Sequence, residues 1–242
     1  MTPWPSTCPN PVASPVMMHR WHNLTFLHWS FEPADVQRLL PPGLTVEAYG
    51  GRAWVGLVPF EMRVWRPPIP VVPWFGAFHE TNVRTYVTGP DGSPGVWFFS
   101  LDAARLGVVV VARGTYHVPY MWSRMRVDRH RTAVSYTTRR WGPTGRGARS
   151  HVRVVPGARF EDDELSEFDH YLTARWQLFG PGRKGLLQGY ADHPQWQLQR
   201  ATLEHCDDEL VMAAGLPKPE GEPIVHYSRG TDVRIAMFTR LR

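Results

Sequence analysis

Lysine is almost absent from this sequence of 242 residues, since only Lys184 and Lys218 occur among its 27 basic side chains. The other basic residues are arginines, whose guanidinium groups stay protonated and cannot form a Schiff base. Cysteine is scarce as well. Cys8 and Cys206 lie far apart, and neither has a second cysteine at metal-ligand spacing, so we expect two free thiols in a reducing compartment.

Signals of export, membrane insertion and several cofactor sites are also missing. The N-terminal residues lack a basic segment followed by an apolar core, and no apolar stretch approaches the ~20 residues of a membrane-spanning helix. We therefore expect a soluble, cytoplasmic protein without a membrane partner. The chain contains no H-E-x-x-H zinc motif, G-x-S-x-G elbow, P-loop or dinucleotide glycine fingerprint, so we expect no metal and no cofactor.

The net charge of +5 and the pI of about 9.5 raise the question of nucleic-acid binding. The arginines, however, are spread along the chain and form no basic run or basic helix. The densest group lies in a glycine-containing segment and consists of Arg139, Arg140, Arg146 and Arg149. This distribution argues against a nucleic-acid partner.

The composition along the chain indicates a proline-rich arm over residues 1–16, which we expect to be loose, and one domain over residues 17–242. A short helix is expected near 32–40, where Pro33 opens an apolar stripe and Pro41-Pro42-Gly43 ends it. A second helix is expected over 164–179, where apolar residues recur at helical spacing.

Most of the remaining segments read as short β-strands separated by glycine and proline turns. The expected strands span 22–29, 44–49, 52–64, 79–87, 95–103, 108–118, 132–140, 149–155, 196–203 and 226–238. Many short strands with two or three helices predict a mostly β (α+β) fold, a closed or half-closed antiparallel barrel flanked by helices. Short turns predict that strands 79–87, 95–103 and 108–118 are antiparallel neighbours.

Strand 79–87 carries the most informative pattern. Since alternate residues of a strand point to opposite faces, Glu80, Asn82, Arg84 and Tyr86 share one face. That face either meets solvent, with a simple Glu80–Arg84 pair, or is buried as a hydrogen-bonded network. Asp102 and Arg113 also interrupt apolar strands, and a shared polar interior explains all three strands at once. We therefore expect Glu80, Arg84, Asp102 and Arg113 to converge on one internal pocket.

A series of motifs carries a resemblance to a known family. HNLTFLHWSF, LLPPGL, GGRAWVGLVPFEM, FHETNVRTYV, GVWFFSLDA, ARGTYHVPYMWSRM, LTARWQLF, HPQWQL and YSRGTDV follow one another from about His19 to the C-terminus. In this order they resemble the uncharacterised bacterial YqjF-like family. That family is distantly similar to acetoacetate decarboxylase, and the resemblance implies a β-barrel or cone-shaped sheet with a central pocket.

The same resemblance bears on the chemistry. In acetoacetate decarboxylase a lysine after an Arg-x-x-x-aromatic-Pro-like segment forms an imine with the substrate ketone. When that segment is laid on Arg113–Pro119, Tyr120 and Met121 take the positions of the two lysines. The pocket glutamate of the decarboxylase corresponds to Glu80. The resemblance thus implies a retained pocket without imine chemistry.

Three functional hypotheses remain open from the sequence. The first is an enzyme in which Glu80 and Tyr120 exchange protons with a substrate while Arg84, Asp102, Arg113 and Tyr116 bind it. The second is a binding protein for a small molecule that uses the same pocket without turnover. The third is a basic module that binds nucleic acid or protein. Burial of Glu80, Arg84 and Asp102 around a cavity would favour the first two, and a homo-oligomer is compatible with all three.

Overall fold

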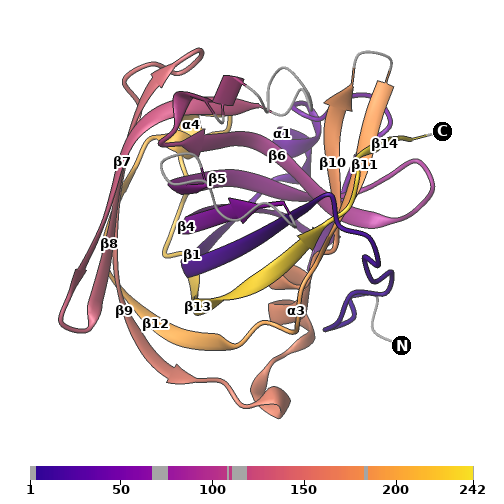
Figure 1. The fold of residues 1–242 in the computed structure, drawn as a ribbon. Coiled ribbons are helices and arrows are strands. Elements are labelled where there is room, and N and C mark those ends of the chain that lie inside the picture. The colour runs from indigo at the N-terminus through magenta and orange to yellow at the C-terminus, as the bar shows by residue number, and fades with distance from the viewer. Residues whose placement is uncertain (1–3, 67–75, 108, 111–118, 183–184, 242) are drawn as a thin grey trace.

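The computed structural model describes residues 4–66, 76–107, 109–110, 119–182 and 185–241. The strands are β1 (Met17–Phe31), β2 (Thr45–Val46), β3 (Ala48–Tyr49), β4 (Arg52–Trp65), β5 (Ala77–Thr88), β6 (Pro94–Ala103), β7 (Tyr120–His130), β8 (Ala133–Gly142), β9 (Arg149–Arg159), β10 (Gln177–Gly182), β11 (Gly185–Asp192), β12 (Leu198–Asp208), β13 (Ile224–Ile235) and β14 (Thr239–Arg240). The helices are α1 (Pro33–Gln37), the 3₁₀ turn η1 (Asp162–Glu164), α3 (Glu167–Thr173) and α4 (Leu210–Ala213). The predicted fold class, mostly β with a few helices, is confirmed (Figure 1).

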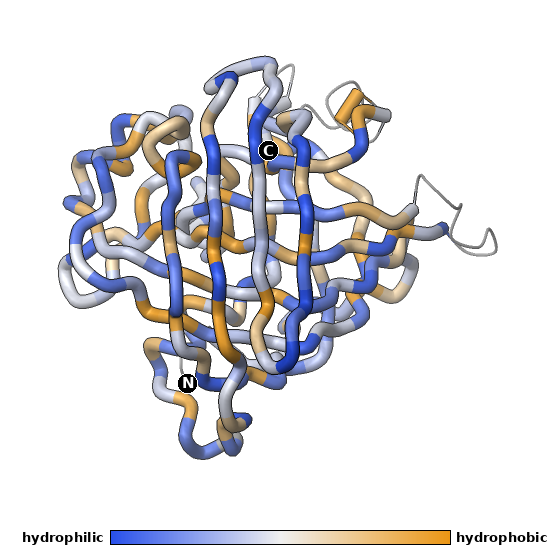
Figure 2. Tube along the Cα trace, turned by 90° about the vertical axis from the view of Figure 1, so that its left-hand side faces the viewer, coloured by the Kyte–Doolittle hydropathy of each residue, from blue (hydrophilic) through white to orange (hydrophobic). Residues whose placement is uncertain are grey.

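Nine strands close a barrel in the order β6-β7-β8-β9-β12-β13-β1-β4-β5, and β5 pairs with β6 to complete the ring. The pairs around it are antiparallel except at one junction, where Leu101–Ala103 of β6 run parallel to Tyr120–Trp122 of β7. Figure 2 views the molecule from the side of β7, β8, β9 and β12, where hydrophilic and hydrophobic residues alternate along the strands. This alternation leaves polar side chains outside and apolar ones in the barrel.

The barrel interior is a packed core. Buried side chains from opposite walls meet there, among them Leu27, Leu57, Val83, Tyr136 and Val154. The helices α1 and α4 add Val36, Leu210 and Val211 to the same cluster. Because each such side chain contributes ~1.5–3 kcal/mol when fully buried, this core is a main source of stability.

A second layer covers the outer face of β1, β4, β5, β6 and β13. In it β10 pairs in parallel with β6, and β11 pairs with both β10 and β13. The helix α3 precedes β10 and lies beside the same layer in Figure 1. The five shared strands therefore have the barrel core on one face and this second layer on the other.

Register shifts set which side chains reach which face. In β1 the pairing with β4 shifts between His22 and Leu27, around Asn23, which has a positive φ of 48°. In β6 the pairing with β5 skips Phe99. Directly paired residues of an antiparallel ladder share a face. Glu80 thus shares its face with Ala103, whereas Asp102 shares the opposite face with Thr81.

The N-terminal arm is not loose over its described part. Trp4 donates a hydrogen bond from Nε1 to Glu47 (2.6 Å), and the Pro5 carbonyl accepts one from the Trp176 indole (3.0 Å). Val12 is buried, and its amide donates to Asp192. Over residues 4–16 the arm has no regular strand or helix, but Trp4 and Val12 each have a hydrogen-bond partner on the domain.

The prediction of a third antiparallel strand over 108–118 is wrong at the described residues 109–110. Val109 and Val110 are helical, and the Val109 amide donates to the Arg105 carbonyl. Residues 111–118 lie outside the described residues. The next strand, β7, runs parallel to β6, because the connection between them is long enough for a crossover.

Other boundaries also differ from the expectation. The helix predicted over 164–179 ends at Thr173, and its last residues instead begin strand β10 at Gln177. Strands β7, β10 and β11 were not predicted. Cys8 and Cys206 are free, as expected. No helix in the described part of the chain is long and apolar enough to cross a membrane.

Candidate functional site

A cavity of about 540 Å³ lies between the shared strands and the second layer. Strand β5 contributes Phe78, Glu80, Asn82 and Arg84 to its wall, which are the alternate residues of one strand face. The rest of the wall comes mainly from β1, β4, β6, β10 and the segment between β11 and β12. Its size is within the usual range for small-molecule sites.

Most of the cavity wall is apolar and aromatic. Phe26, Phe60 and Phe98 line it. At one side the rings of Trp21 and Trp196 stack with centroids 6.0 Å apart, and His193 lies 4.5 Å from Trp196. Polar groups in such surroundings are poorly hydrated, so their charged forms are disfavoured.

Glu80 is the central polar group of this wall. Only 1% of the residue is exposed, and its Oε2 accepts a hydrogen bond from the Tyr120 hydroxyl at 3.0 Å. Burial raises the pKa of Glu80 to about 8, although hydrogen bonds from Tyr120 and Asn82 oppose the shift. Burial and the neighbouring Glu80 also raise the pKa of Tyr120 well above its usual value. Near neutral pH both groups are thus mostly protonated, and since Tyr120 donates its hydrogen to Glu80, the carboxyl O–H of Glu80 is the donor left for a ligand.

Two arginines lie farther along the same cavity. Arg84 donates from Nη2 to the Leu172 carbonyl (3.3 Å), and its Nε is buried without a partner in the described structure. Arg175 is 5% exposed and pairs through Nη1 with Glu47 at 2.7 Å. Its Nη2 is likewise buried and unpaired within the described residues. Both guanidinium carbons lie within 6 Å of the Tyr86 ring, at 5.9 and 4.7 Å from its centroid.

Arg175 was missed by the sequence reasoning, which assigned its segment to a helix. The signal was present, since Arg175 is the only charged residue in the apolar run LTARWQLF. Asn82 belongs to the predicted face of β5 and also lines the cavity. The hypothesis that this face of β5 is buried is therefore correct, since Glu80 and Asn82 are buried and Arg84 is half-buried.

Histidines add neutral polar groups to the cavity. Burial lowers the pKa of both His19 and His193 to about 4, so both are uncharged at neutral pH. Both ring nitrogens of His19 are buried without a partner among the described residues. Within the ranges that the structure describes, no group of three or more histidine, cysteine, aspartate or glutamate side chains could hold a metal ion.

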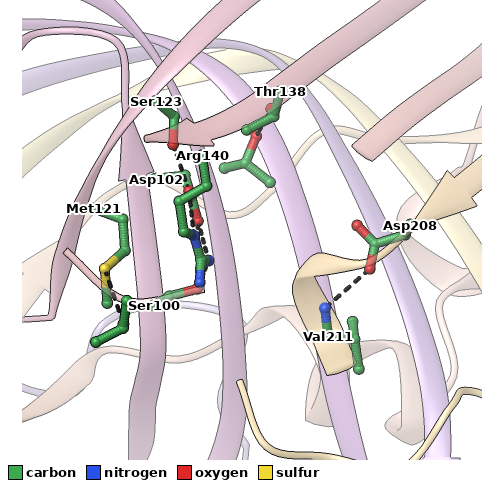
Figure 3. A network of polar contacts seen from close by, with 10 residues as sticks. Ser100, Asp102, Met121, Ser123, Thr138, Arg140, Asp208 and Val211 are labelled. Carbon is green, nitrogen blue, oxygen red and sulfur yellow. Dashed lines mark hydrogen bonds and ion pairs between the residues drawn. The ribbon is translucent and has the colours of Figure 1, made fainter. Parts of the chain in front are cut away.

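Asp102 does not reach this cavity, contrary to the expected convergence. It lies on the opposite face of β6 and forms a buried ion pair with Arg140, whose Nη2 is 2.5 Å from Oδ2. Ser123 donates to Asp102 Oδ1 at 2.6 Å, and Ser100 accepts from Arg140 at 2.9 Å (Figure 3). The error has its cause in Phe99, an extra residue that has no partner on β5. After Phe99, the side chains of β6 point to the faces opposite to those that regular alternation predicts. Asp102 is thus part of a separate, mutually satisfied network.

The predicted site residues that remain are Arg113, Tyr116 and Tyr120. Arg113 and Tyr116 lie outside the described residues. Tyr120 lines the cavity, whereas Met121 is buried elsewhere and accepts a weak hydrogen bond from Thr144 at its sulfur (3.5 Å). Lys218 is exposed, and no lysine lines the cavity in the part of the chain that the structure describes.

Comparison with known sequences gives two findings. The profile of the DUF2071 family, described as an uncharacterised conserved protein, matches residues 18–232. The uncharacterised protein YqjF of Bacillus subtilis strain 168 is 33% identical over 219 residues, which cover 90% of this chain and 89% of YqjF. The resemblance found in the motifs thus extends over nearly the whole chain.

Comparison with solved structures identifies the fold. An acetoacetate decarboxylase-like enzyme from Sphingomonas wittichii RW1 superposes with a TM-score of 0.63 at 15% identity, over 95% of this chain and 94% of that one. The enduracididine biosynthesis enzyme MppR, in complex with pyruvate, gives a TM-score of 0.63 at 12% identity, over 94% and 91%. At these identities the likeness establishes the architecture alone.

Proposed function

Because this chain belongs to the DUF2071 family and has the fold of acetoacetate decarboxylase-like enzymes, we propose that its cavity binds a small metabolite with a carbonyl or carboxylate group. The observation that carries the proposal is the Glu80–Tyr120 pair in an apolar cavity of about 540 Å³. Because the Tyr120 hydroxyl donates to Oε2 of Glu80, the hydrogen of the protonated carboxyl is left to donate a hydrogen bond to a ligand oxygen.

The pair also supports proton transfer. A pKa of about 8 lets Glu80 exist in both protonation states close to neutral pH, which suits a general acid or base. Glu80 in its protonated form polarises a ligand carbonyl, and in its ionised form it accepts a proton from the carbon next to that carbonyl. Tyr120 holds the carboxyl group in position by donating its hydroxyl hydrogen to Oε2. The proposed chemistry is therefore acid–base chemistry at a carbonyl compound.

The proposal does not include an imine intermediate. Tyr120 lines the cavity at a position where the resemblance to acetoacetate decarboxylase expects a lysine. Of the two lysines, Lys218 is exposed and Lys184 is outside the described residues. The pyruvate complex of MppR, a protein with the same architecture, makes 2-oxo acids the first compounds to test.

A non-catalytic binding protein remains the second candidate, because the same wall serves binding without turnover. The burial of Glu80 and Asp102, with Arg84 half-buried, speaks against a module that uses them as an exposed basic or acidic surface. Product formation from a bound ligand distinguishes an enzyme from a binding protein. We give preference to the enzyme because the pKa of Glu80 is displaced toward neutrality.

The test is a binding screen with matched variants. Isothermal titration with pyruvate, acetoacetate and longer oxo and hydroxy acids should find at least one ligand. Glu80→Leu and Tyr120→Phe should weaken its binding by about tenfold or more, since the first removes the buried donor to the ligand and the second removes the hydroxyl group that holds this donor in position. Glu204→Gln and Tyr190→Phe, which change side chains outside the cavity, serve as controls. Equal affinity of Glu80→Leu and the parent protein for every ligand would contradict the proposal.

A further inference from the structure

The cavity has a second polar end, at a distance from Glu80. Glu80 and Arg84 point from the same face of β5 and are four residues apart, so their Cα atoms are about 13 Å apart at ~3.3 Å per residue. Between them on the same face of β5 lies Asn82, with Val58 of β4 and Leu101 of β6 on either side. The donor pair and the arginines therefore form separate sites at two ends of one mainly apolar space.

The arginine end has unused hydrogen-bonding capacity. The Nε of Arg84 and the Nη2 of Arg175 are both buried and have no partner within the described structure. Glu47 neutralises Arg175, but no carboxylate within the described residues pairs with Arg84. A partly buried guanidinium such as that of Arg84 is costly without a counter-charge, and a ligand carboxylate would lower that cost.

The size of the cavity argues against a very small ligand. Acetoacetate has seven non-hydrogen atoms, and at ~30 Å³ per atom, the share of one water molecule in the liquid, it occupies on the order of 200 Å³. The cavity measures about 540 Å³. A ligand that contacts both ends needs a longer apolar middle part.

We propose that the ligand is an elongated carboxylic acid with an apolar middle, whose carboxylate binds Arg84 and Arg175 and whose distant carbonyl or hydroxyl group binds Glu80 and Tyr120. This inference rests on the proposed function and specifies its ligand class. The polar groups of such a ligand are about 10–12 Å apart. Since a C–C bond of ~1.5 Å advances an extended chain by ~1.25 Å, this span corresponds to about eight to ten carbon atoms.

A length series of simple probes tests the inference. Titration with ω-hydroxy acids of four, six, eight, ten and twelve carbons should give the tightest binding at about eight to ten carbons. Octanoate, which lacks the distant hydroxyl, and the methyl ester of 8-hydroxyoctanoate, which lacks the charge, should each bind about tenfold more weakly or worse than 8-hydroxyoctanoate. These comparisons need no variant protein.

Variants identify the arginine end. Arg84→Gln and Arg175→Lys should each lower the affinity for 8-hydroxyoctanoate about 10- to 100-fold. The affinity for its methyl ester should change less than threefold. The lysine substitution keeps a cation beside Glu47 and so protects the fold, and Arg200→Gln, at an exposed ion pair with Glu164, is the control. Circular dichroism verifies that each variant is folded.

The outcomes separate the two proposals. If pyruvate or acetoacetate binds in a Glu80-dependent manner but affinity does not rise with chain length, the elongated ligand is overturned and the proposed function stands. The same holds if Arg84→Gln and Arg175→Lys bind 8-hydroxyoctanoate as the parent protein does. If none of the short or long compounds binds at all, both proposals fall.

Discussion

At the scale of single residues, the protonation of Glu80 links stability to pH. Its carboxyl group has a pKa of about 8 in the folded protein, against an ordinary value of 4.5 for a solvated glutamate, because burial disfavours the charged form. The folded state therefore binds more protons than the unfolded state between about pH 4.5 and about pH 8. The stability that Glu80 contributes in its protonated form is fully present below about pH 4.5 and is lost as the pH rises through about 8.

The matching prediction uses Glu80→Gln, which imitates the protonated side chain. The free energy of unfolding of the variant should lie within about 1 kcal/mol of that of the parent at pH 5. At pH 9 it should exceed the parent's value by several kcal/mol, since each pKa unit corresponds to ~1.4 kcal/mol. Chemical denaturation at pH 5, 7 and 9 measures the difference. The control variant Glu204→Gln, which changes an exposed side chain of β12, should have the same free energy of unfolding as the parent at all three pH values. A constant difference between Glu80→Gln and the parent across pH would show that Glu80 is not buried as described.

At the scale of secondary-structure elements, strand β6 separates two polar systems. Asp102 and Arg140 are 0% and 1% exposed at their side chains and lie on the barrel side, whereas Leu101 lines the cavity. We predict that Asp102→Asn costs about 3–5 kcal/mol of stability, because it leaves the Arg140 charge buried and unpaired. Ligand affinity of the cavity should stay within twofold of the parent.

Urea denaturation and titration of the same Asp102→Asn preparation measure both quantities. Asp128→Asn removes the exposed pair with Arg126 and should cost less than about 1 kcal/mol. A loss of ligand binding in folded Asp102→Asn would mean that the two faces of β6 are coupled and that Asp102 belongs to the binding site after all.

The sequence predicted strands well where apolar and polar residues alternate or β-branched residues cluster. It also placed Glu80, Asn82 and Arg84 on one face, because period two within a single strand is a local property. It misplaced Asp102, since the extra residue Phe99 is recognised only from the pairing of β6 with β5 and leaves no local signal.

Segments such as the valine run before Arg113 are ambiguous between strand and helix on pattern alone. Arg175 and Arg140 reach their partners across the fold, at sequence distances that no local pattern reveals.

At the scale of the whole molecule, the fold resembles that of acetoacetate decarboxylase-like enzymes, and Tyr120 lines the cavity. We predict that incubation with acetoacetate or pyruvate and borohydride gives no adduct on a cavity residue, because no lysine lines the cavity in the described part of the chain and arginine, tyrosine and methionine form no imine. Mass spectrometry measures the adduct. Tyr120→Lys, which brings an amine beside Glu80, is the informative companion variant and should gain a trappable adduct. A lysine adduct on the parent protein, accompanied by turnover, would overturn the prediction.

The skipped residue in β6 has a consequence for comparing family members. Because Phe99 is an extra residue without a partner on β5, deleting it would leave Leu101 and Asp102 opposite Asn82 and Thr81, on their present faces. A regular strand that kept Phe99 would instead turn Asp102 into the cavity and Leu101 toward Arg140, so both compartments would lose their present chemistry at once. A relative without the bulge therefore keeps this binding site only if it is also one residue shorter between Phe98 and Ser100.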